Sequence, residues 1–234
     1  ITSFLPYGNA YRDGLFVTVA DVNGDGPMEI ITAKQKGSPN VRVFGYKGGR
    51  FTQVYREFNG EAASYKNGLS LTSGDLNGDH KDEIMTAPAG AGSRTVRVFQ
   101  LQGTTLKQIA QKTNAINGTG LSLATADLGN DGTAEILVGP RSNAAPILRA
   151  FALRGTTLTQ LRKDVLVFRS NERAGLRLSA VDLNADGKDD VVASYGALVQ
   201  PRLTILNGTN FAKLKTLHVF STKDRLILSH DSGT

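Results

Sequence analysis

The chain has 234 residues, of which 40% are hydrophobic, and 27 Lys and Arg outweigh 21 Asp and Glu to give a net charge of +6. This length is sufficient for a substantial core in one domain or two. The absence of cysteine excludes disulfides and thiolate chemistry. No apolar run approaches the roughly 18 residues of a membrane span, and no signal segment begins at Ile1, so we expect no transmembrane segment and a mature or excised piece of a protein.

Four short segments with alternating apolar residues predict a first set of strands. Each follows a glycine, and its two apolar residues stand six and four positions before an aspartate. The pairs are Leu15/Val17, Leu69/Leu71, Leu121/Leu123 and Leu176/Leu178. An alternation of this kind is typical of a strand with one apolar face.

A nine-residue acidic segment follows each predicted strand. The segments begin at Asp21, Asp75, Asp127 and Asp182. The sequence therefore repeats with periods of 54, 52 and 55 residues. Acidic residues occupy positions one, five and nine of every segment, and Asn occupies position three except where Gly129 takes its place. Glycine at position six permits the positive φ of a tight curl, and only His80 departs from it.

Oxygen ligands at alternate positions of a curled loop are what a hard cation requires. Ca²⁺ takes six to eight oxygens at roughly 2.3–2.6 Å, and a backbone carbonyl at position seven, where the side chains vary, would contribute to the set. The alternative interpretation is that clusters of Asp, Asn and Gly form turns without a metal. The charge count favours the cation, because the four segments hold 14 of the 21 acidic residues and such crowding is repulsive unless it is neutralised.

An EF-hand loop begins in the same way, but it requires a bidentate Glu at position twelve and a helix on each side. Position twelve here is Thr32, Thr86, Val138 or Ala193. The sequence therefore does not predict EF-hands.

The residues after each acidic segment predict three more strands. An aliphatic pair comes first: Ile30-Ile31, Ile84-Met85, Ile136-Leu137 and Val191-Val192. Such a short apolar run is typical of a strand buried on both faces. A third strand contains 41–44, 96–99, 148–151 or 203–206, and a glycine hairpin leads into a fourth, such as 51–58 or 214–220. An Arg recurs inside the first three of these third strands, and we expect it at a blade face or rim.

Four-stranded repeats at about 14–58, 68–112, 120–168 and 175–220 predict an all-β fold, a β-propeller of four-stranded antiparallel blades in a single domain of residues 1–234. Residues 1–13, with Phe4 at the place of Phe58, are interpreted as the tail of a preceding blade. Residues 225–228 are interpreted as the first strand of a following one. We therefore expect four full blades plus partial blades at both ends, either as a fragment of a larger propeller or as a small propeller closed by its termini.

The Asp-x-Asn-Gly-Asp-Gly-x-x-Glu/Asp segment between two strands resembles the FG-GAP/VCBS repeat family, the calcium-loop propeller blades of integrin α-subunits and many bacterial surface proteins. Thr86-Ala87-Pro88 and Val138-Gly139-Pro140 are weak echoes of the family's Gly-Ala-Pro element. The resemblance implies up to four Ca²⁺ ions, and His80 and Gly129 make the second and third loops the least complete. The implied metal ligands are Asp21, Asn23, Asp25, Pro27 and Glu29; Asp75, Asn77, Asp79, Lys81 and Glu83; Asp127, Asp131, Thr133 and Glu135; and Asp182, Asn184, Asp186, Lys188 and Asp190, with position seven binding through its carbonyl.

For function, the resemblance implies a non-catalytic, calcium-binding interaction or adhesion module of an exported or cell-surface protein, with a periplasmic location as the alternative. A protein or anionic glycan partner is expected on the face opposite the calcium loops, and nucleic acid is not expected. The alternative is a lectin-like binder of anionic glycans, and a further alternative is a polysaccharide lyase or hydrolase domain. The histidines, His80, His218 and His230, stand at unrelated places in the repeat and nominate no catalytic group.

Basic residues dominate outside the acidic segments, where 25 Lys and Arg face 7 acids. The connections expected on the opposite face are 34–40, 88–95, 139–146, 194–201, 59–67, 113–119 and 169–174. They carry Lys34, Lys36, Lys66, Arg94, Arg141, Arg169 and Arg173. Such a surface attracts anionic polymers. The alternative is a solvated surface that offsets the charge of the acidic loops.

Overall fold

The computed structural model of the chain describes residues 3–195 and 202–218, and all the regular structure in these residues is β-strand. The first sheet contains β1 (Leu15–Ala20), β2 (Glu29–Lys34), β3 (Asn40–Lys47), β4 (Arg50–Gln53) and β5 (Phe58–Asn59). The second contains β6 (Leu69–Gly74), β7 (Glu83–Pro88), β8 (Val96–Gln102) and β9 (Thr105–Lys112). The third contains β10 (Leu121–Ala126), β11 (Glu135–Pro140), β12 (Ile147–Arg154), β13 (Thr157–Gln160) and β14 (Val165–Leu166). The fourth contains β15 (Leu176–Val181), β16 (Asp190–Tyr195), β17 (Arg202–Leu206) and β18 (Lys213–His218).

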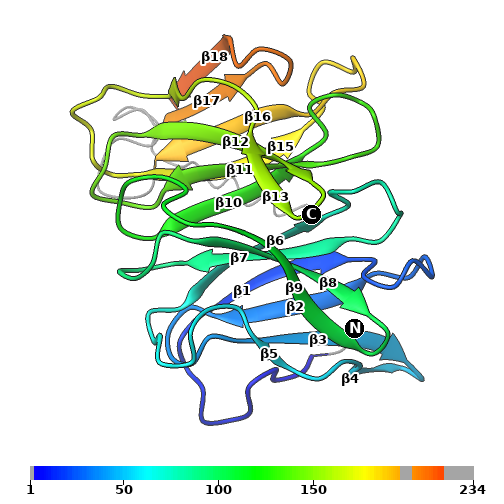
Figure 1. Cartoon of the computed structure of the whole chain (residues 1–234). Coiled ribbons are helices and arrows are strands. Elements are labelled where there is room, and N and C mark those ends of the chain that lie inside the picture. The colour runs from blue at the N-terminus through cyan, green and yellow to red at the C-terminus, as the bar shows by residue number, and fades with distance from the viewer. Residues whose placement is uncertain (1–2, 196–201, 219–234) are drawn as a thin grey trace, which may run out of the picture.

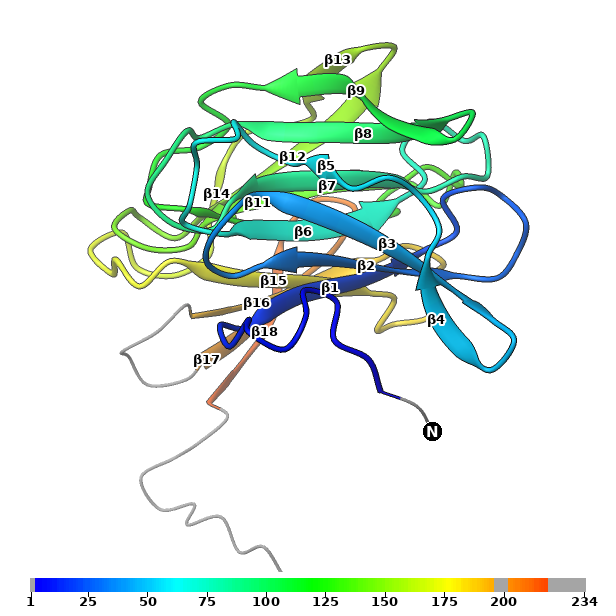
Figure 2. The same cartoon turned by 90° about the horizontal axis from the view of Figure 1, so that it is seen from below.

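Each sheet is one antiparallel propeller blade, and the blades lie beside one another in chain order. Figure 1 shows them stacked from the blue first blade to the orange strands of the fourth, and Figure 2 views the stack from the side of the first blade. The first strand of each blade packs against the first strand of the next, β1 on β6, β6 on β10 and β10 on β15. The predicted all-β propeller with four blades is confirmed. The described residues contain no helix long and apolar enough to cross a membrane.

The fourth strand of blades 1 and 3 differs from the prediction, because it is split in two. Phe44 pairs with Gln53, whereas Val41 pairs with Phe58, so two residues of β3 face four residues of the opposite strand. β12 shows the same offset between β13 and β14. A bulge therefore interrupts the strand expected over 51–58. Residues 219–220 and the strand expected at 225–228 lie outside the described residues.

Residues 3–13 precede β1 without forming a strand. Phe4 nevertheless packs on Phe44, with the ring centroids 4.9 Å apart, in the way that Phe58 packs on Phe99 at 4.6 Å. Phe44 and Phe99 occupy the same place in their blades. Phe4 thus takes the predicted place of Phe58, through its side chain rather than through strand pairing.

Three hydrophobic clusters fill the spaces between neighbouring blades. One joins blades 1 and 2 through residues such as Ile31 and Leu71, a second joins blades 2 and 3, and a third joins blades 3 and 4. The second strand β7 is buried along its whole length, as predicted. No fourth cluster joins blade 4 to blade 1 among the described residues, and Val17 and Val19 of β1 are each 57% exposed.

Glycines form the junctions between blades. Gly68, Gly120 and Gly175 directly precede the first strands of blades 2, 3 and 4 and have φ values of 74°, 69° and 73°. A Cβ on Gly68 would lie 2.0 Å from the carbonyl oxygen of Gln35 in the preceding blade. The corresponding distances are 2.3 Å from Gly120 to Ala89 and 2.1 Å from Gly175 to Arg141. Only a residue without a side chain fits at these positions, where backbone meets backbone.

Replacing Gly68 with Ala should lower the free energy of unfolding by more than the roughly 1–2 kcal/mol that a left-handed alanine costs, because the methyl group also overlaps the Gln35 carbonyl. Gly49→Ala is the matched control, since Gly49 has a φ of 82° and open space where a side chain would be. Urea titrations of both variants measure the difference. Equal destabilisation would mean that the junction tolerates a methyl group.

Candidate functional site

The acidic segments form the hairpin loops between the first and second strands of each blade. The last ladder pairs before the loops are Ala20–Glu29, Gly74–Glu83, Ala126–Glu135 and Val181–Asp190. Position nine is therefore the first residue of the second strand. All four loops lie at the same end of their blades, because the strand order repeats.

In the first loop Asp21 accepts several backbone hydrogen bonds. The N–H groups of Gly24 and Gly26 donate to its two carboxylate oxygens at 2.7 Å and 2.8 Å. Asn23 Oδ1 accepts the N–H of Asp25 at 2.8 Å, and Asn23 Nδ2 donates to Glu29 Oε1 at 3.3 Å. The side chains at positions one, three, five and nine are thus tied to one another or to the backbone that they enclose.

The other loops repeat this arrangement. The N–H of position six donates to the Asp at position one from His80, Gly132 and Gly187, at 2.8 Å, 2.9 Å and 2.9 Å. The N–H of position seven donates to the Asp at position five in loops two, three and four. In the third loop, where Gly129 offers no side chain, the Thr133 hydroxyl donates to Asp131 at 2.5 Å. The loops therefore share one backbone path but differ in their side-chain donors.

Positions four and six have positive φ in all four loops. Position six was predicted, and His80 adopts the required conformation with a φ of 62°. A left-handed conformation costs a residue with a side chain about 1 kcal/mol or more, so the loop geometry overrides the preference of His80. Position four was not predicted, and its residues are Gly24, Gly78, Asn130 and Ala185.

At position nine, where the second strand begins, three of the four carboxylates are buried and that of Glu135 is half-buried. Glu83 is fully buried, and burial, together with the charges of Asp79 and Asp75, raises its pKa to about 7. Burial likewise raises the pKa of Glu29 and of Glu135. A cation in the loop would offset both the lost hydration and the repulsion between the carboxylates.

The carboxylate of Asp190 has one oxygen that could bind a cation. Its Oδ1 accepts the N–H of Gly208 at 3.1 Å, whereas its Oδ2 is buried without a hydrogen-bond partner. A buried oxygen without a partner is unfavourable, and this oxygen remains available as a ligand. No three carboxylate or imidazole side chains within the described residues stand close enough to hold a metal alone. Asn184 and the Lys188 carbonyl belong to the same predicted set, and oxygen donors of these kinds suit Ca²⁺.

Each loop after the first also hydrogen-bonds to the loop of the preceding blade. Backbone N–H groups at position eight donate to the carbonyl at position one, from Asp82 to Asp21 at 2.9 Å, from Ala134 to Asp75 at 2.7 Å and from Asp189 to Asp127 at 3.0 Å. In loops two and four the position-eight carboxylate accepts the N–H of the same partner residue, at 2.9 Å in both cases. The four loops therefore form one continuous row.

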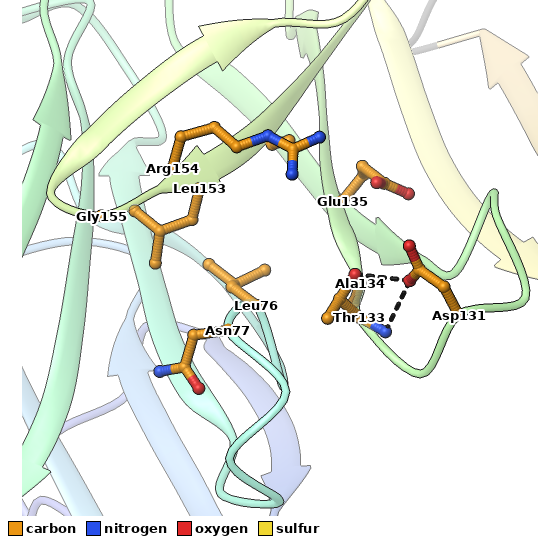
Figure 3. A pocket seen from close by; sticks show the side chains of 10 residues that line it. Leu76, Asn77, Asp131, Thr133, Ala134, Glu135, Leu153, Arg154 and Gly155 are labelled. Atoms are coloured by element: carbon orange, nitrogen blue, oxygen red, sulfur yellow. Dashed lines mark hydrogen bonds between the residues drawn. The ribbon is translucent and has the colours of Figure 1, made fainter.

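A cavity of about 210 Å³ separates the second loop from the third (Figure 3). Asn77 lies on one side, Asp131 and Glu135 lie on the other, and the Arg154 side chain extends over the cavity toward the acidic side. Hydrogen bonds from Thr133 lower the pKa of Asp131, and the charge of Arg154 contributes to the shift. In the third loop, the positively charged Arg154 side chain thus lies near the acidic residues.

The connections predicted to lie opposite the loops meet one another. The N–H of Gly37 donates to the Lys66 carbonyl at 2.8 Å, and the N–H of Asn143 donates to the Arg173 carbonyl at 2.9 Å. These bonds join the connection after the second strand of a blade to the connection that leaves the same blade. Residues 196–201 of the predicted set lie outside the described residues.

Only part of the predicted basic set is exposed there. Lys34 lies 4.8 Å from the ring centroid of Tyr7, Arg94 donates to Asn114 and Asn117, and Arg141 is half-buried. The exposed members are Lys36, Lys66, Arg169 and Arg173. We call these four residues the basic rim.

The Arg repeated in the third strands has a structural role in each of the three blades. Its guanidinium pairs with a carboxylate from the end of a fourth strand or the connection after it. The pairs are Arg42–Glu57, Arg97–Glu61 and Arg149–Asp164. These ion pairs give a physical reason for the repeated Arg, which was expected at a blade face or rim.

Two groups of residues near these surfaces were not predicted. Asp82 and Asp189 join neighbouring loops, and the sequence signal was a fourth acid in the second and fourth segments only. Arg177 lies on β15 beside Arg141. The sequence feature that could have indicated Arg177 is a charged residue inside a strand of alternating apolar residues. The equivalent position in β6 is Ser70.

These features define a class of protein, a β-propeller with an Asp-rich hairpin loop in every blade. Residues 21–86 match the FG-GAP-like repeat, from the first loop to the second strand of blade 2. The chain therefore carries an FG-GAP-like repeat, and the predicted resemblance is confirmed. No curated protein sequence matches the chain.

Solved structures with the same fold include enzymes and a lectin. Rhamnogalacturonan lyase YesW is 17% identical and has a TM-score of 0.52, with 86% of this chain and 50% of that chain covered. The Bacillus licheniformis rhamnogalacturonan lyase gives the same values. An Agrocybe aegerita lectin described as recognising non-reducing terminal N-acetylglucosamine is 18% identical and has a TM-score of 0.52, with 88% of this chain and 52% of that chain covered. The chain spans about half the length of these structures, and the likeness shows the fold alone.

The raised pKa of Glu83 predicts a pH dependence in calcium-free protein. The protonated form is favoured in the folded state, so this contribution to stability is present below pH 4.5 and is lost as the pH rises through about 7. The loss should be on the order of 3 kcal/mol. Glu83→Gln should flatten this part of the curve, measured by urea unfolding in EDTA at pH 5 and pH 8. Parallel curves for the parent and the variant would contradict the assignment.

Proposed function

We propose that this chain is a non-catalytic, calcium-stabilised β-propeller that acts as an interaction or adhesion module at the cell surface or outside the cell. The observation that carries the proposal is one loop network repeated in four blades, with Asp at position one and a carboxylate at position nine that is buried in three of them. Bound Ca²⁺ would neutralise each loop and hold its hairpin closed. The unpartnered Asp190 Oδ2 supports this role.

Calcium should therefore raise the melting temperature of chelator-treated protein. A ligand that binds only the folded state contributes roughly 2.7 kcal/mol per site at a hundredfold excess over its Kd. Asp21→Ala should remove more of this stabilisation than Asp127→Ala, because the third loop lacks the Asn ligand and has Arg154 beside its acids. Calorimetry with and without Ca²⁺ measures both effects.

Asp13→Ala provides the matched control, since Asp13 is an exposed acid outside the loops. This variant should respond to calcium as the parent does. A melting temperature that is the same in EDTA and in Ca²⁺ would overturn the calcium proposal. Equal losses in the Asp21 and Asp127 variants would overturn only the ranking of the loops.

A second candidate function is lectin-like binding of anionic glycans. The basic rim favours it, because four exposed bases lie on connections at the end of the blades opposite the acidic loops. The structures of similar fold include a lectin and lyases named for a polysaccharide. The face that carries the basic rim would bind carbohydrate, whereas the calcium loops would maintain the shape of the propeller.

Binding to heparin or polygalacturonate should weaken steeply with salt, as contacts that release counterions do. Replacing the four basic-rim residues with Ser should reduce retention on a heparin column to that of a neutral protein. A control variant replaces Lys47, Arg50, Lys107 and Lys213, which are exposed residues of the outer strands and hairpins, and should retain most binding. Equal losses in the two variants would show that only net charge matters.

The further alternative is a lyase or hydrolase domain. Incubation with rhamnogalacturonan distinguishes it from a binding module, because an enzyme produces new unsaturated or reducing ends. We expect binding without new ends.

A further inference from the structure

Two arginines from adjacent blades meet where the inner strands begin, at the end of the propeller opposite the acidic loops. Arg141 directly follows β11, and Arg177 is the second residue of β15. Arg177 Nη1 donates to the Arg141 carbonyl at 3.3 Å and to the Leu176 carbonyl at 2.9 Å. Both side chains are half-buried.

The Arg141 side chain is held by residues of the first two blades. Its guanidinium carbon lies 4.9 Å from the ring centroid of Phe16, and its Nη1 donates to Ser70 Oγ at 3.4 Å. The Ser70 hydroxyl donates in turn to the Leu121 carbonyl. All four blades therefore contribute a residue to this place, in the order Phe16, Ser70, Arg141 and Arg177.

The two arginines differ from the half-buried arginines of the third strands. Arg42, Arg97, Arg149 and Arg202 each pair with a carboxylate. Within the described residues, neither Arg141 nor Arg177 has a carboxylate within ion-pair distance.

The arrangement brings two half-buried positive charges together. Burial, and then the charge of Arg177, lowers the pKa of Arg141 to about 10, and burial also lowers the pKa of Arg177. Both side chains remain charged at neutral pH, so two like charges lie close together with part of their hydration removed. Each guanidinium has five N–H donors, and within the described residues the two side chains donate three hydrogen bonds in total. A group with two anionic oxygens would satisfy the donors and neutralise the charge.

We propose that Arg141 and Arg177 form an oxyanion site for the carboxylate or sulfate group of an anionic sugar. The inference rests on the glycan-binding function proposed above and names the group that this face recognises. The basic rim would attract the polymer from a distance, whereas the arginine pair would bind one sugar unit.

The experiment uses single sugars, so that long-range attraction to a polymer does not contribute. Galacturonate tests the carboxylate, galactose 6-sulfate tests the sulfate, and galactose is the neutral control, with binding followed by NMR of the arginine side chains. The double variant R141Q/R177Q should lose at least tenfold in affinity for whichever anionic sugar binds. The matched double variant R50Q/R56Q removes the same charge from exposed positions outside the basic rim and should stay within twofold of the parent.

A second measurement separates binding from a structural role. Because the two guanidiniums repel each other, ligand-free R177Q should melt at the same temperature as the parent or above it, with an unchanged response to calcium. A lower melting temperature together with retained sugar binding would assign Arg177 to structure and overturn the proposal. Equal binding of galactose, no binding of either anionic sugar, or preference for a short single-stranded oligonucleotide would also overturn it. Failure of the calcium proposal would be seen separately, because the melting temperature of the parent protein would then be the same with and without Ca²⁺.

Discussion

Each blade after the first begins with a glycine that lies against a backbone carbonyl of the blade before it. The contact leaves no room for a Cβ, so Gly68, Gly120 and Gly175 fix how closely the inner strands approach. At the other end of the same strands, position-eight N–H groups reach back to the position-one carbonyl of the preceding loop. Every inner strand is thereby fastened to its neighbour at both ends, and the hydrophobic clusters fill the space between.

This double attachment places opposite charges at opposite ends of the propeller. The acidic loops form a row at one end because each loop bonds to the one before it. At the other end, the glycine junctions bring the start of β15 against Arg141, and Arg177 donates to the same carbonyl that Gly175 approaches. The geometry that aligns the loops is therefore also the geometry that brings two arginines together.

Much of this arrangement could be predicted from the sequence, because it depends on short-range patterns. The Leu15/Val17 alternation and the spacing of acids after Asp21 each specify a local conformation, and their repetition specifies the blade. The split of the fourth strand could not be predicted, because it depends on two extra residues opposite β3 rather than on residue type. The partner of Arg97 comes from the connection that follows the preceding blade, and no local pattern contains that contact. For the same reason the role of Arg177 could not be predicted, because the residues around it come from blades that are far apart in the chain.

Consecutive antiparallel pairing has a consequence for how the chain unfolds. Every strand pairs within its own blade, with the next or previous strand except for β5 and β14, which pair with β3 and β12. Each blade has extensive contacts only with adjacent blades. Stability in such an array is approximately a sum of the stability of each unit and of each nearest-neighbour interface. The two outer blades, each with one internal interface in the described chain, should open before the two middle ones. Partly unfolded states with frayed end blades are then expected, and agreement between calorimetric and van't Hoff enthalpies becomes a measure of how far cooperativity extends along the stack.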